Sequence, residues 1–299
     1  MPAPGKLMRW PRLVLIAKTV LLSASNAPIA LAESDCGSSL APCAIANGEY
    51  HFAAPSVPPG SRGYPVVIML HGWASSGKAA LQDVNSVAPV TARGYLFVAP
   101  NALHAGSGKR DWSVRDGQPP RRDERAFLND VLGDLEKRMP LDRDRVLLTG
   151  FSRGGSMVWN IACENPQAFA AYAPVAGGFW DPLPGSCKGP VRLFHTHGWG
   201  DATVPLEGRP LGNSGLVQGN IFAGLGIWRD TNLCASRPAE KRLTSGDRWL
   251  RSWETCAPDS ELRLILHPGG HSIPADWADS ALDWFEAGTN MTGRIAGQR

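Results

Sequence analysis

The sequence predicts an α/β fold in which helices cover both faces of a mostly parallel β-sheet. Unbroken apolar runs are typical of strands buried on both sides, and they lie at residues 66–70, 96–100, 145–149, 170–175, 191–195 and 262–267. Helical stretches separate these runs, at about residues 76–92, 123–138, 154–165, 216–229 and 276–287. Because strand and helix alternate, we expect parallel strands joined by right-handed helical crossovers.

The 299 residues suffice for one large domain with a buried core, which we expect at residues 49–287. A small hairpin insertion is predicted near its end, because two strand-like runs at 241–243 and 249–253 flank the turn sequence S-G-D. Residues 33–48 are expected to form a disulfide-tied lead-in, and residues 288–299 a flexible C-terminal tail.

Residues 1–32 have the pattern of a secretory signal peptide. Three basic residues precede an apolar run at 13–22, and small residues lead to the sequence A-L-A at 30–32, which is typical of a cleavage site before Glu33. The apolar run is too short to cross a bilayer, so no stable membrane anchor is expected after cleavage. The sequence therefore predicts a secreted or periplasmic protein.

The charge distribution gives no indication of a nucleic-acid partner. Residues 1–32 hold four of the 30 basic residues and no acidic one, which leaves 26 basic against 27 acidic residues in the remainder. A nearly neutral chain offers no electrostatic basis for binding nucleic acid or an anionic membrane. No protein partner is implied either.

All the cysteines follow the predicted cleavage site, and they are Cys36, Cys43, Cys163, Cys187, Cys234 and Cys256. An even number in an exported chain indicates disulfides, although several pairings are open and buried free thiols are the alternative. Proximity in sequence favours the pairs Cys36–Cys43, Cys163–Cys187 and Cys234–Cys256. The cysteines and histidines show no spacing typical of a zinc site, so neither a metal nor another cofactor is expected.

The sequence G-F-S-R-G at residues 150–154 matches the G-x-S-x-G pattern of a nucleophile elbow. It follows the apolar run at 145–149 and leads into a predicted helix, which is the context that this elbow needs. Gly150 and Gly154 suit the tight turn, and the helix N-terminus favours negative charge beside the hydroxyl. We therefore predict an α/β-hydrolase fold with Ser152 as the nucleophile, the alternative being a glycine-rich turn with an idle serine.

A nucleophile elbow needs an acid and then a histidine later in the chain. His267 and His271 both come after the run at 262–266, and we favour His271 as the base because its P-G-G-H-S loop lets it reach over the carboxyl ends of the strands. Asp201 is the predicted acid, because its loop directly follows the strand at 191–195. Other candidate acids follow no core strand as closely, and they are Asp181, Asp230, Asp247 and Asp259.

The predicted oxyanion hole takes one backbone N–H from Arg153, the residue after the nucleophile, and a second from the L-H-G-W loop after the first core strand. We choose Trp73 as the second donor, with Gly72 as the alternative. The same loop fits the phosphate-binding pattern G-x-x-x-x-G-K at residues 72–78. Ala79 stands where that pattern needs Ser or Thr for magnesium, which argues against nucleotide binding.

Several tryptophans lie on loops expected at the rim of the site, and we predict that they line an apolar or aromatic substrate pocket. These residues are Trp73, Trp112, Trp180 and Trp199. His195 and His197 alternate at a strand end, as metal ligands would. No third ligand lies at a recognisable spacing, so a structural role beside the site is favoured.

These motifs resemble those of exported, single-domain α/β-hydrolases of the polyhydroxybutyrate depolymerase-like and feruloyl esterase-like branch. The resemblance covers residues 36–287 and includes the cysteine-rich lead-in. Its motifs are L-H-G-W at 70–73, G-F-S-R-G-G-S-M at 150–157, H-G-W-G-D-A-T-V-P at 197–205 and G-G-H-S at 269–272.

The resemblance implies Ser152, Asp201 and His271 as the catalytic triad, and it also implies the disulfides 163–187 and 234–256. The chain departs from the family pattern at Arg153, where Gln is common, and in the pair before Asp201, where residues smaller than Trp199 are usual. Both departures lie beside the expected pocket, so they concern the identity of the substrate and not the chemistry.

The sequence thus predicts an exported serine esterase that hydrolyses carboxylic esters through an acyl-enzyme. The expected substrates are hydroxybutyrate oligomers, feruloyl or acetyl esters, or other small esters, because the sequence shows no linker and added domain for binding a solid polymer. A secreted serine peptidase with the same triad and a catalytically inactive ligand-binding protein are the alternatives.

Overall fold

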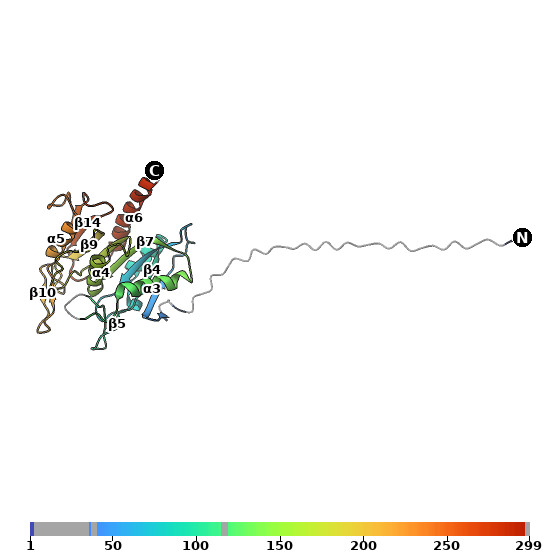
Figure 1. The fold of residues 1–299 in the computed structure, drawn as a ribbon, viewed down its shortest axis with the longest axis horizontal. Helices are drawn as coiled ribbons and strands as arrows, with labels where there is room; N and C mark the ends of the chain where they lie inside the picture. Colours follow the sequence, from blue (N-terminus) through green and yellow to red (C-terminus); the bar gives the residue numbers. More distant parts are fainter. Residues whose placement is uncertain (3–35, 37–40, 115–118, 297–299) are drawn as a thin grey trace. The chain divides into compact units, whose positions relative to one another are not determined.

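The computed structural model describes residues 1–2, 36, 41–114 and 119–296, with the backbone alone for 289–296. Residues 1–33 and 34–299 form two separate units, and the predicted signal peptide at 1–32 lies almost entirely outside the described residues. The elements labelled in Figure 1 all belong to the second unit.

A ten-stranded sheet forms the centre of this unit, in the order β1-β2-β4-β3-β7-β8-β9-β14-β13-β12. Its six inner strands are parallel to one another, as the apolar runs predict. They are β3 (Tyr64–Leu70), β4 (Leu96–Pro100), β7 (Leu141–Phe151), β8 (Ala171–Val175), β9 (Arg192–Gly198) and β14 (Glu261–His267). The fold is therefore the predicted one.

Antiparallel strands extend the sheet at both edges. On one side β2 (Gly48–Ala53) pairs with β4 and with β1 (Cys43–Ile45), two strands that the sequence analysis missed. On the other side β12 (Lys241–Ser245) and β13 (Arg248–Trp253) form the predicted hairpin, and β13 pairs with β14. The hairpin is thus part of the main sheet.

Two short hairpins lie outside the main sheet. One joins β5 (Leu103–His104) to β6 (Arg110–Asp111), and the other joins β10 (Arg209–Pro210) to β11 (Val217–Gln218). The second hairpin corrects one boundary, because residues predicted to begin a helix at 216 pair as a strand instead.

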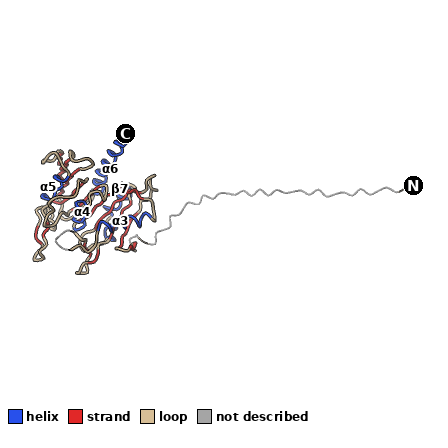
Figure 2. The backbone as a smooth tube through the Cα atoms, in the orientation of Figure 1, coloured by secondary structure: helices blue, strands red, loops and turns tan. Residues whose placement is uncertain are grey.

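The described residues form six helices, of which five lie between strands in the sequence and the sixth follows the last strand. Helices are blue in Figure 2. They are α1 (Gly77–Leu81), α2 (Val84–Ala92), α3 (Glu124–Glu136), α4 (Arg153–Glu164), α5 (Ile221–Thr231) and α6 (Trp277–Ala296). The single helix predicted at 76–92 is two helices, because the Asp83 side chain accepts a hydrogen bond from the Asn85 amide and starts α2. The last helix continues beyond residue 287, where the domain was expected to end.

The core lies in two layers, one on each face of the sheet. Val66, Ile68 and Leu70 of β3 belong to the layer that includes α3, α4 and α5. Val67 and Met69 of the same strand belong to the layer that includes α2 and α6. Successive side chains of a strand point to opposite faces, so one continuous apolar run fills both layers.

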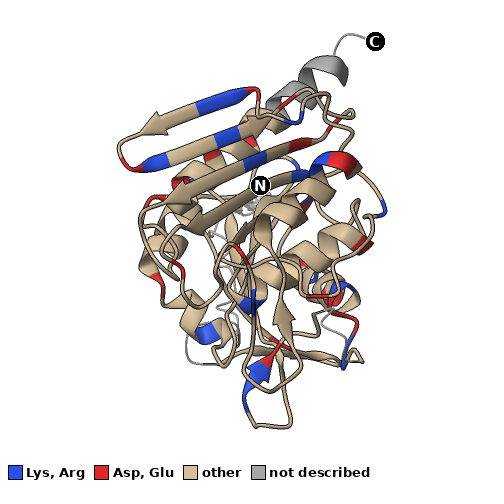
Figure 3. Ribbon diagram, turned by 90° about the vertical axis from the view of Figure 1, so that its left-hand side faces the viewer, with Lys and Arg blue, Asp and Glu red and all other residues tan. Residues whose placement is uncertain are grey.

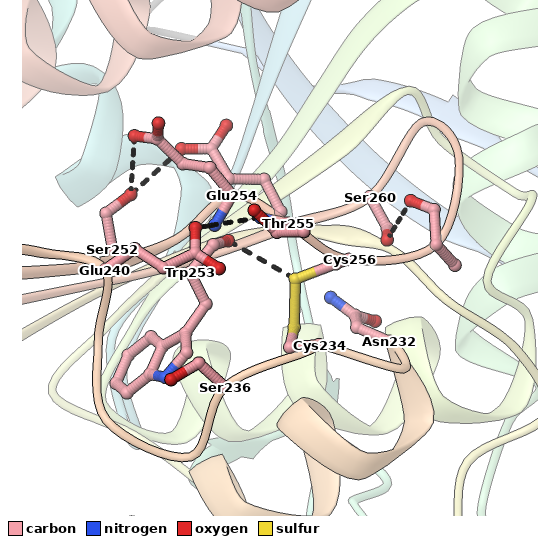
Figure 4. Close-up of a disulfide and its surroundings, with 12 residues drawn as sticks. Asn232, Cys234, Ser236, Glu240, Ser252, Trp253, Glu254, Thr255, Cys256 and Ser260 are labelled. Atoms are coloured by element: carbon pink, nitrogen blue, oxygen red, sulfur yellow. Dashed lines mark hydrogen bonds between the residues drawn. A yellow bond between two sulfur atoms is a disulfide. The ribbon is translucent and has the colours of Figure 1, made fainter.

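Three disulfides join the cysteines that are close in sequence, namely Cys36–Cys43, Cys163–Cys187 and Cys234–Cys256. Figure 4 shows the last of these, which ties the segment after α5 to the segment after β13. Asn232 lies beside it and exchanges hydrogen bonds with the Val191 backbone, at 2.9 and 2.8 Å. The pairing predicted from proximity is thus the one in the structure.

Lys and Arg lie interspersed with Asp and Glu over the elements drawn in Figure 3. Several form ion pairs between elements. Arg93, which follows α2, contacts Asp283 at 2.7 Å and Glu286 at 2.6 Å on α6. None of the helices within the described residues combines the length and the apolar composition that a membrane crossing needs.

Candidate active site

Ser152 occupies the turn between β7 and α4 in a backbone conformation that few residues other than glycine adopt. Its φ is 57° and its ψ is −120°, and its amide donates to the Val175 carbonyl at 2.9 Å. A non-glycine residue with positive φ is strained and has to be held by its surroundings. The turn places the hydroxyl at the carboxyl end of the sheet and at the N-terminus of α4.

The glycines after Ser152 are required because backbone atoms approach them closely. A Cβ on Gly154 would lie 2.1 Å from the Leu70 carbonyl oxygen. A Cβ on Gly155 would lie 2.6 Å from the Val175 carbonyl oxygen. Since no side chain fits at these distances, the motif reflects the close packing of α4 on β3 and β8 as well as the turn itself.

The structure brings the three residues predicted as a triad into one hydrogen-bonded line. His271 Nε2 lies 2.8 Å from Ser152 Oγ, and His271 Nδ1 lies 2.7 Å from Asp201 Oδ2. Asp201 follows β9 and His271 follows β14, which are adjacent parallel strands, so their loops emerge at the same edge as Ser152. These distances are suited to proton transfer.

Asp201 is held as a carboxylate. Its side chain is fully buried, and burial opposes ionisation. The nearby His197 Nε2, 3.4 Å from Oδ2, and hydrogen bonds from His271 and the Val204 amide outweigh this burial and lower the pKa of Asp201 below its usual range. The Thr203 and Val204 amides donate to Oδ1 at 2.9 and 2.8 Å, so Oδ2 is the oxygen that faces His271.

His267, the alternative base, does not hydrogen-bond to Ser152. It ends β14, and its Nδ1 accepts a hydrogen bond from the Gly269 amide at 3.1 Å. Burial and the nearby Arg248 lower the pKa of His267, which favours the neutral ring. His267 thus supports the start of the loop that carries His271.

His195 and His197 form a buried hydrogen-bonded chain beside the predicted acid. His195 Nδ1 lies 3.3 Å from Trp159 Nε1, and His195 Nε2 lies 3.0 Å from His197 Nδ1. An indole N–H only donates, so His195 accepts at Nδ1 and donates from Nε2. His197 then donates from its own Nε2 to the Val204 carbonyl at 2.8 Å. Burial lowers the pKa of His195, which agrees with a neutral ring.

In the part of the chain that the structure describes, no three His, Cys, Asp or Glu side chains are grouped as a metal site.

The phosphate-loop pattern at residues 72–78 has a packing explanation, because a Cβ on Gly77 would lie 2.1 Å from the Ala99 carbonyl oxygen. The glycine therefore permits α1 to lie against β4, and Lys78 beside it is exposed.

The two amides predicted for the oxyanion hole belong to segments that meet at Ser152. Arg153 is the first residue of α4, where the helix dipole favours negative charge. The loop after β3 packs against the nucleophile, because a Cβ on Gly72 would lie 3.4 Å from Ser152 Cβ. Trp73 follows in this loop, and Ala74 after it has a φ of 61°. Both segments thus lie next to Ser152.

The four tryptophans predicted for the pocket differ in exposure. Trp73 is 54% exposed and Trp199 is 36% exposed. Trp180 is buried, with the Arg153 guanidinium 4.5 Å from its ring centroid. Trp112 is fully buried, and its indole donates to a backbone carbonyl of the loop after β3. The placement of Trp112 in the pocket wall is therefore corrected, because it supports that loop from inside.

A pocket beside His271 was missed by the sequence analysis. Its volume is about 350 Å³, and Phe151 and Ile273 contribute to its apolar wall. The Phe151 ring centroid lies 4.7 Å from that of His271. Asp83 and Ser86, joined by a 2.6 Å hydrogen bond, add polar atoms to the lining. Phe151 and Ile273 could have been predicted as pocket residues, because they lie close to Ser152 and His271 in the sequence. Nothing in the sequence indicated Asp83 and Ser86.

The fold, together with the hydrogen bonds that join Ser152 through His271 to Asp201, defines this protein as an α/β-hydrolase. The structure is similar to an acetyl xylan esterase from Aspergillus awamori, with a TM-score of 0.61 at 16% identity over 80% of this chain and 94% of that one. It is also similar to a Bacillus cereus carboxylesterase, with a TM-score of 0.53 at 13% identity over 81% and 95% of the two chains. At these identities the likeness concerns the fold alone.

Residues 47–295 match the family model described as "Putative esterase", and the chain belongs to that family. Relatives include "Probable feruloyl esterase C" of Aspergillus niger, 26% identical over 176 residues, which are 59% of this chain and 56% of the relative. The protein of the same name from Aspergillus clavatus is 28% identical over 228 residues, which are 70% and 79% of the two chains. The feruloyl esterase-like resemblance is thus confirmed, although the match spans little more than half of the first relative.

Proposed function

We propose that this esterase hydrolyses carboxylic esters with Ser152 as nucleophile, His271 as general base and Asp201 as orienting acid. The observation that carries the proposal is the line from Ser152 Oγ through His271 to the buried carboxylate, with distances of 2.8 and 2.7 Å. His271 donates from Nδ1 to Asp201, so Nε2 accepts the proton of Ser152.

In the proposed reaction Ser152 Oγ attacks the ester carbonyl carbon while its proton moves to His271 Nε2. The amides of Arg153 and Trp73 donate to the carbonyl oxygen as it becomes negative. The protonated ring then gives its proton to the leaving alcohol. Water, deprotonated by the same ring, attacks the acyl-enzyme, and the ring then returns this proton to Ser152 Oγ as the carboxylic acid leaves.

The pocket beside His271 supports a small ester as the substrate. Its volume of about 350 Å³ and its largely apolar lining are typical of small-ligand sites. The names of the relatives support feruloyl esters, and acetyl esters are a second candidate. Hydroxybutyrate oligomers are a further candidate, which rests on the sequence resemblance alone.

A panel of substrates with a covalent probe tests this proposal. The purified protein should be labelled by a fluorophosphonate and should hydrolyse at least one of p-nitrophenyl acetate, methyl ferulate and a hydroxybutyrate dimer ester. A peptide anilide is the control and should be cleaved more slowly. Faster cleavage of the anilide would indicate a peptidase, and a folded protein without label or turnover would indicate a ligand-binding protein.

We also propose that the chain is exported, to the periplasm or to the medium. The three disulfides support this location, because such bonds persist in oxidising compartments. The mature protein should begin at Glu33, which N-terminal sequencing of the protein recovered outside the cytoplasm would test. Uncleaved chain in the cytoplasm with free thiols would contradict the proposal.

A further inference from the structure

Strand β6 and the residue after it contact the loop that carries the Trp73 amide. The Arg110 carbonyl accepts a hydrogen bond from the Ala74 amide at 2.9 Å. Trp112, two residues later, donates from Nε1 to the His71 carbonyl at 2.7 Å. The loop after β3 is therefore held on both sides of Trp73 by residues from one short segment.

Asp111, between these two residues, contacts the nucleophile elbow instead. Its carboxylate accepts hydrogen bonds from Arg153 Nε at 2.8 Å and from Arg153 Nη2 at 3.3 Å. The Arg153 side chain is 10% exposed and that of Asp111 is 17% exposed. The guanidinium also lies over the Trp180 ring. A two-point ion pair that is shielded from water in this way holds both partners in one geometry.

The two halves of the proposed oxyanion hole need such support. Ala74 has a φ of 61° and Ser152 a φ of 57°, and residues other than glycine keep such angles only where their neighbours hold them. Donors to an oxyanion act at about 3 Å, so a small rotation of either peptide plane removes the contact. The separation of the two amides therefore depends on what joins the two segments.

We propose that Asp111 is a positioning residue that sets the separation of the Arg153 and Trp73 amides by joining the nucleophile elbow to the loop after β3. The inference rests on the proposed function, because it takes these amides as the oxyanion hole. It also gives a reason for Arg153 beside the nucleophile. Asp111 binds the Arg153 guanidinium, and a side chain held in this way restricts the orientation of the Arg153 backbone amide.

Two variants and a matched control separate positioning from stability. Asp111→Asn breaks the pair but leaves the Arg153 cation buried, which also destabilises the fold. The double variant D111L/R153M removes both charges of the pair and replaces them with apolar side chains, which restores stability without the pair. Arg121, whose guanidinium lies 3.7 Å from the Asp111 carboxylate, remains, but its side chain is 33% exposed and stays hydrated. The control Glu136→Gln breaks a two-point pair of similar geometry but greater exposure, with Arg143 at 2.6 and 2.7 Å, near the opposite end of β7.

We expect D111N to lower kcat by about 10- to 100-fold and to change KM by less than about threefold, because oxyanion donors act in the transition state. A boronic acid that forms a tetrahedral adduct with the serine should bind more weakly by a similar factor. D111L/R153M should recover the Tm of the parent while its kcat stays low. E136Q should keep kcat within about twofold of the parent.

A double variant that recovers both Tm and kcat would overturn the proposal, since the pair would then serve stability alone. Unchanged kcat in D111N would overturn it as well. Failure of the proposed function is a different result, because the parent protein itself would then take no fluorophosphonate label at Ser152. A labelled parent with an unaffected D111N variant refutes only the role of Asp111.

Discussion

Ser152→Ala is expected to abolish labelling by a fluorophosphonate and to lower kcat by about 10⁴- to 10⁶-fold. The substitution removes the oxygen that forms the acyl-enzyme, together with its 2.8 Å hydrogen bond to His271 Nε2. Only substrate binding and the oxyanion donors would then accelerate the reaction. Because a single oxygen atom is lost from a partly exposed position, Tm should change little. Mass spectrometry of the protein after treatment with the probe measures the labelling, and steady-state kinetics measure kcat.

Ser156→Ala is the matched control on the same helix. The Ser156 hydroxyl accepts hydrogen bonds from the Gly178 amide at 3.3 Å and from Trp180 Nε1 at 3.2 Å. Its loss leaves two buried donors without this partner, which lowers stability. The folded variant should nevertheless take the label at Ser152. A parent protein labelled at Ser156, or labelling that survives in Ser152→Ala, would refute the assignment of the nucleophile.

The inner parallel strands were predictable because each places apolar side chains in both core layers, which gives an unbroken apolar run in the sequence. The strand Gly48–Ala53, which lies between the edge strand β1 and β4, has no such run, since polar residues such as Glu49 and His51 interrupt its apolar residues. Its partner across the sheet, β4, is distant in sequence, and periodicity does not reveal such pairing. The break between α1 and α2 depends on one capping side chain, Asp83, within a stretch that otherwise continues.

The arrangement of the candidate site was predictable where a motif fixes a residue to a strand end. Ser152, Asp201 and His271 each follow a core strand, and parallel strands bring their carboxyl ends to one edge. The contact between Asp111 and Arg153 joins residues 42 apart in sequence through a side chain, and no local pattern encodes it. The burial of Trp112 likewise depends on a tertiary contact rather than on its loop.

Asp201→Asn is expected to keep the fold and to lower turnover by about 10⁴-fold. The asparagine oxygen can still accept from the Thr203 and Val204 amides, which donate to Oδ1 in the parent. Its amide nitrogen then faces His271 Nδ1, and this N–H favours the tautomer in which Nδ1 accepts and Nε2 carries the proton. A protonated Nε2 cannot take the proton of Ser152. Circular dichroism and kcat, measured on the same preparation, test both parts of the prediction.

Substitution of His271 should affect catalysis directly, whereas substitution of His267 should mainly affect the loop that carries His271. His271→Ala should lower turnover as much as Asp201→Asn or more, because it removes the base itself. His267→Ala removes the acceptor of the Gly269 amide, 3.1 Å away, and so loosens the loop without removing the base. Its loss of turnover should be far smaller and should come with a lower Tm. An inactive His267→Ala variant beside a nearly normal His271→Ala variant would assign the base to His267. Ser152 Oγ would then have to form a hydrogen bond with His267 in place of the one that it forms with His271.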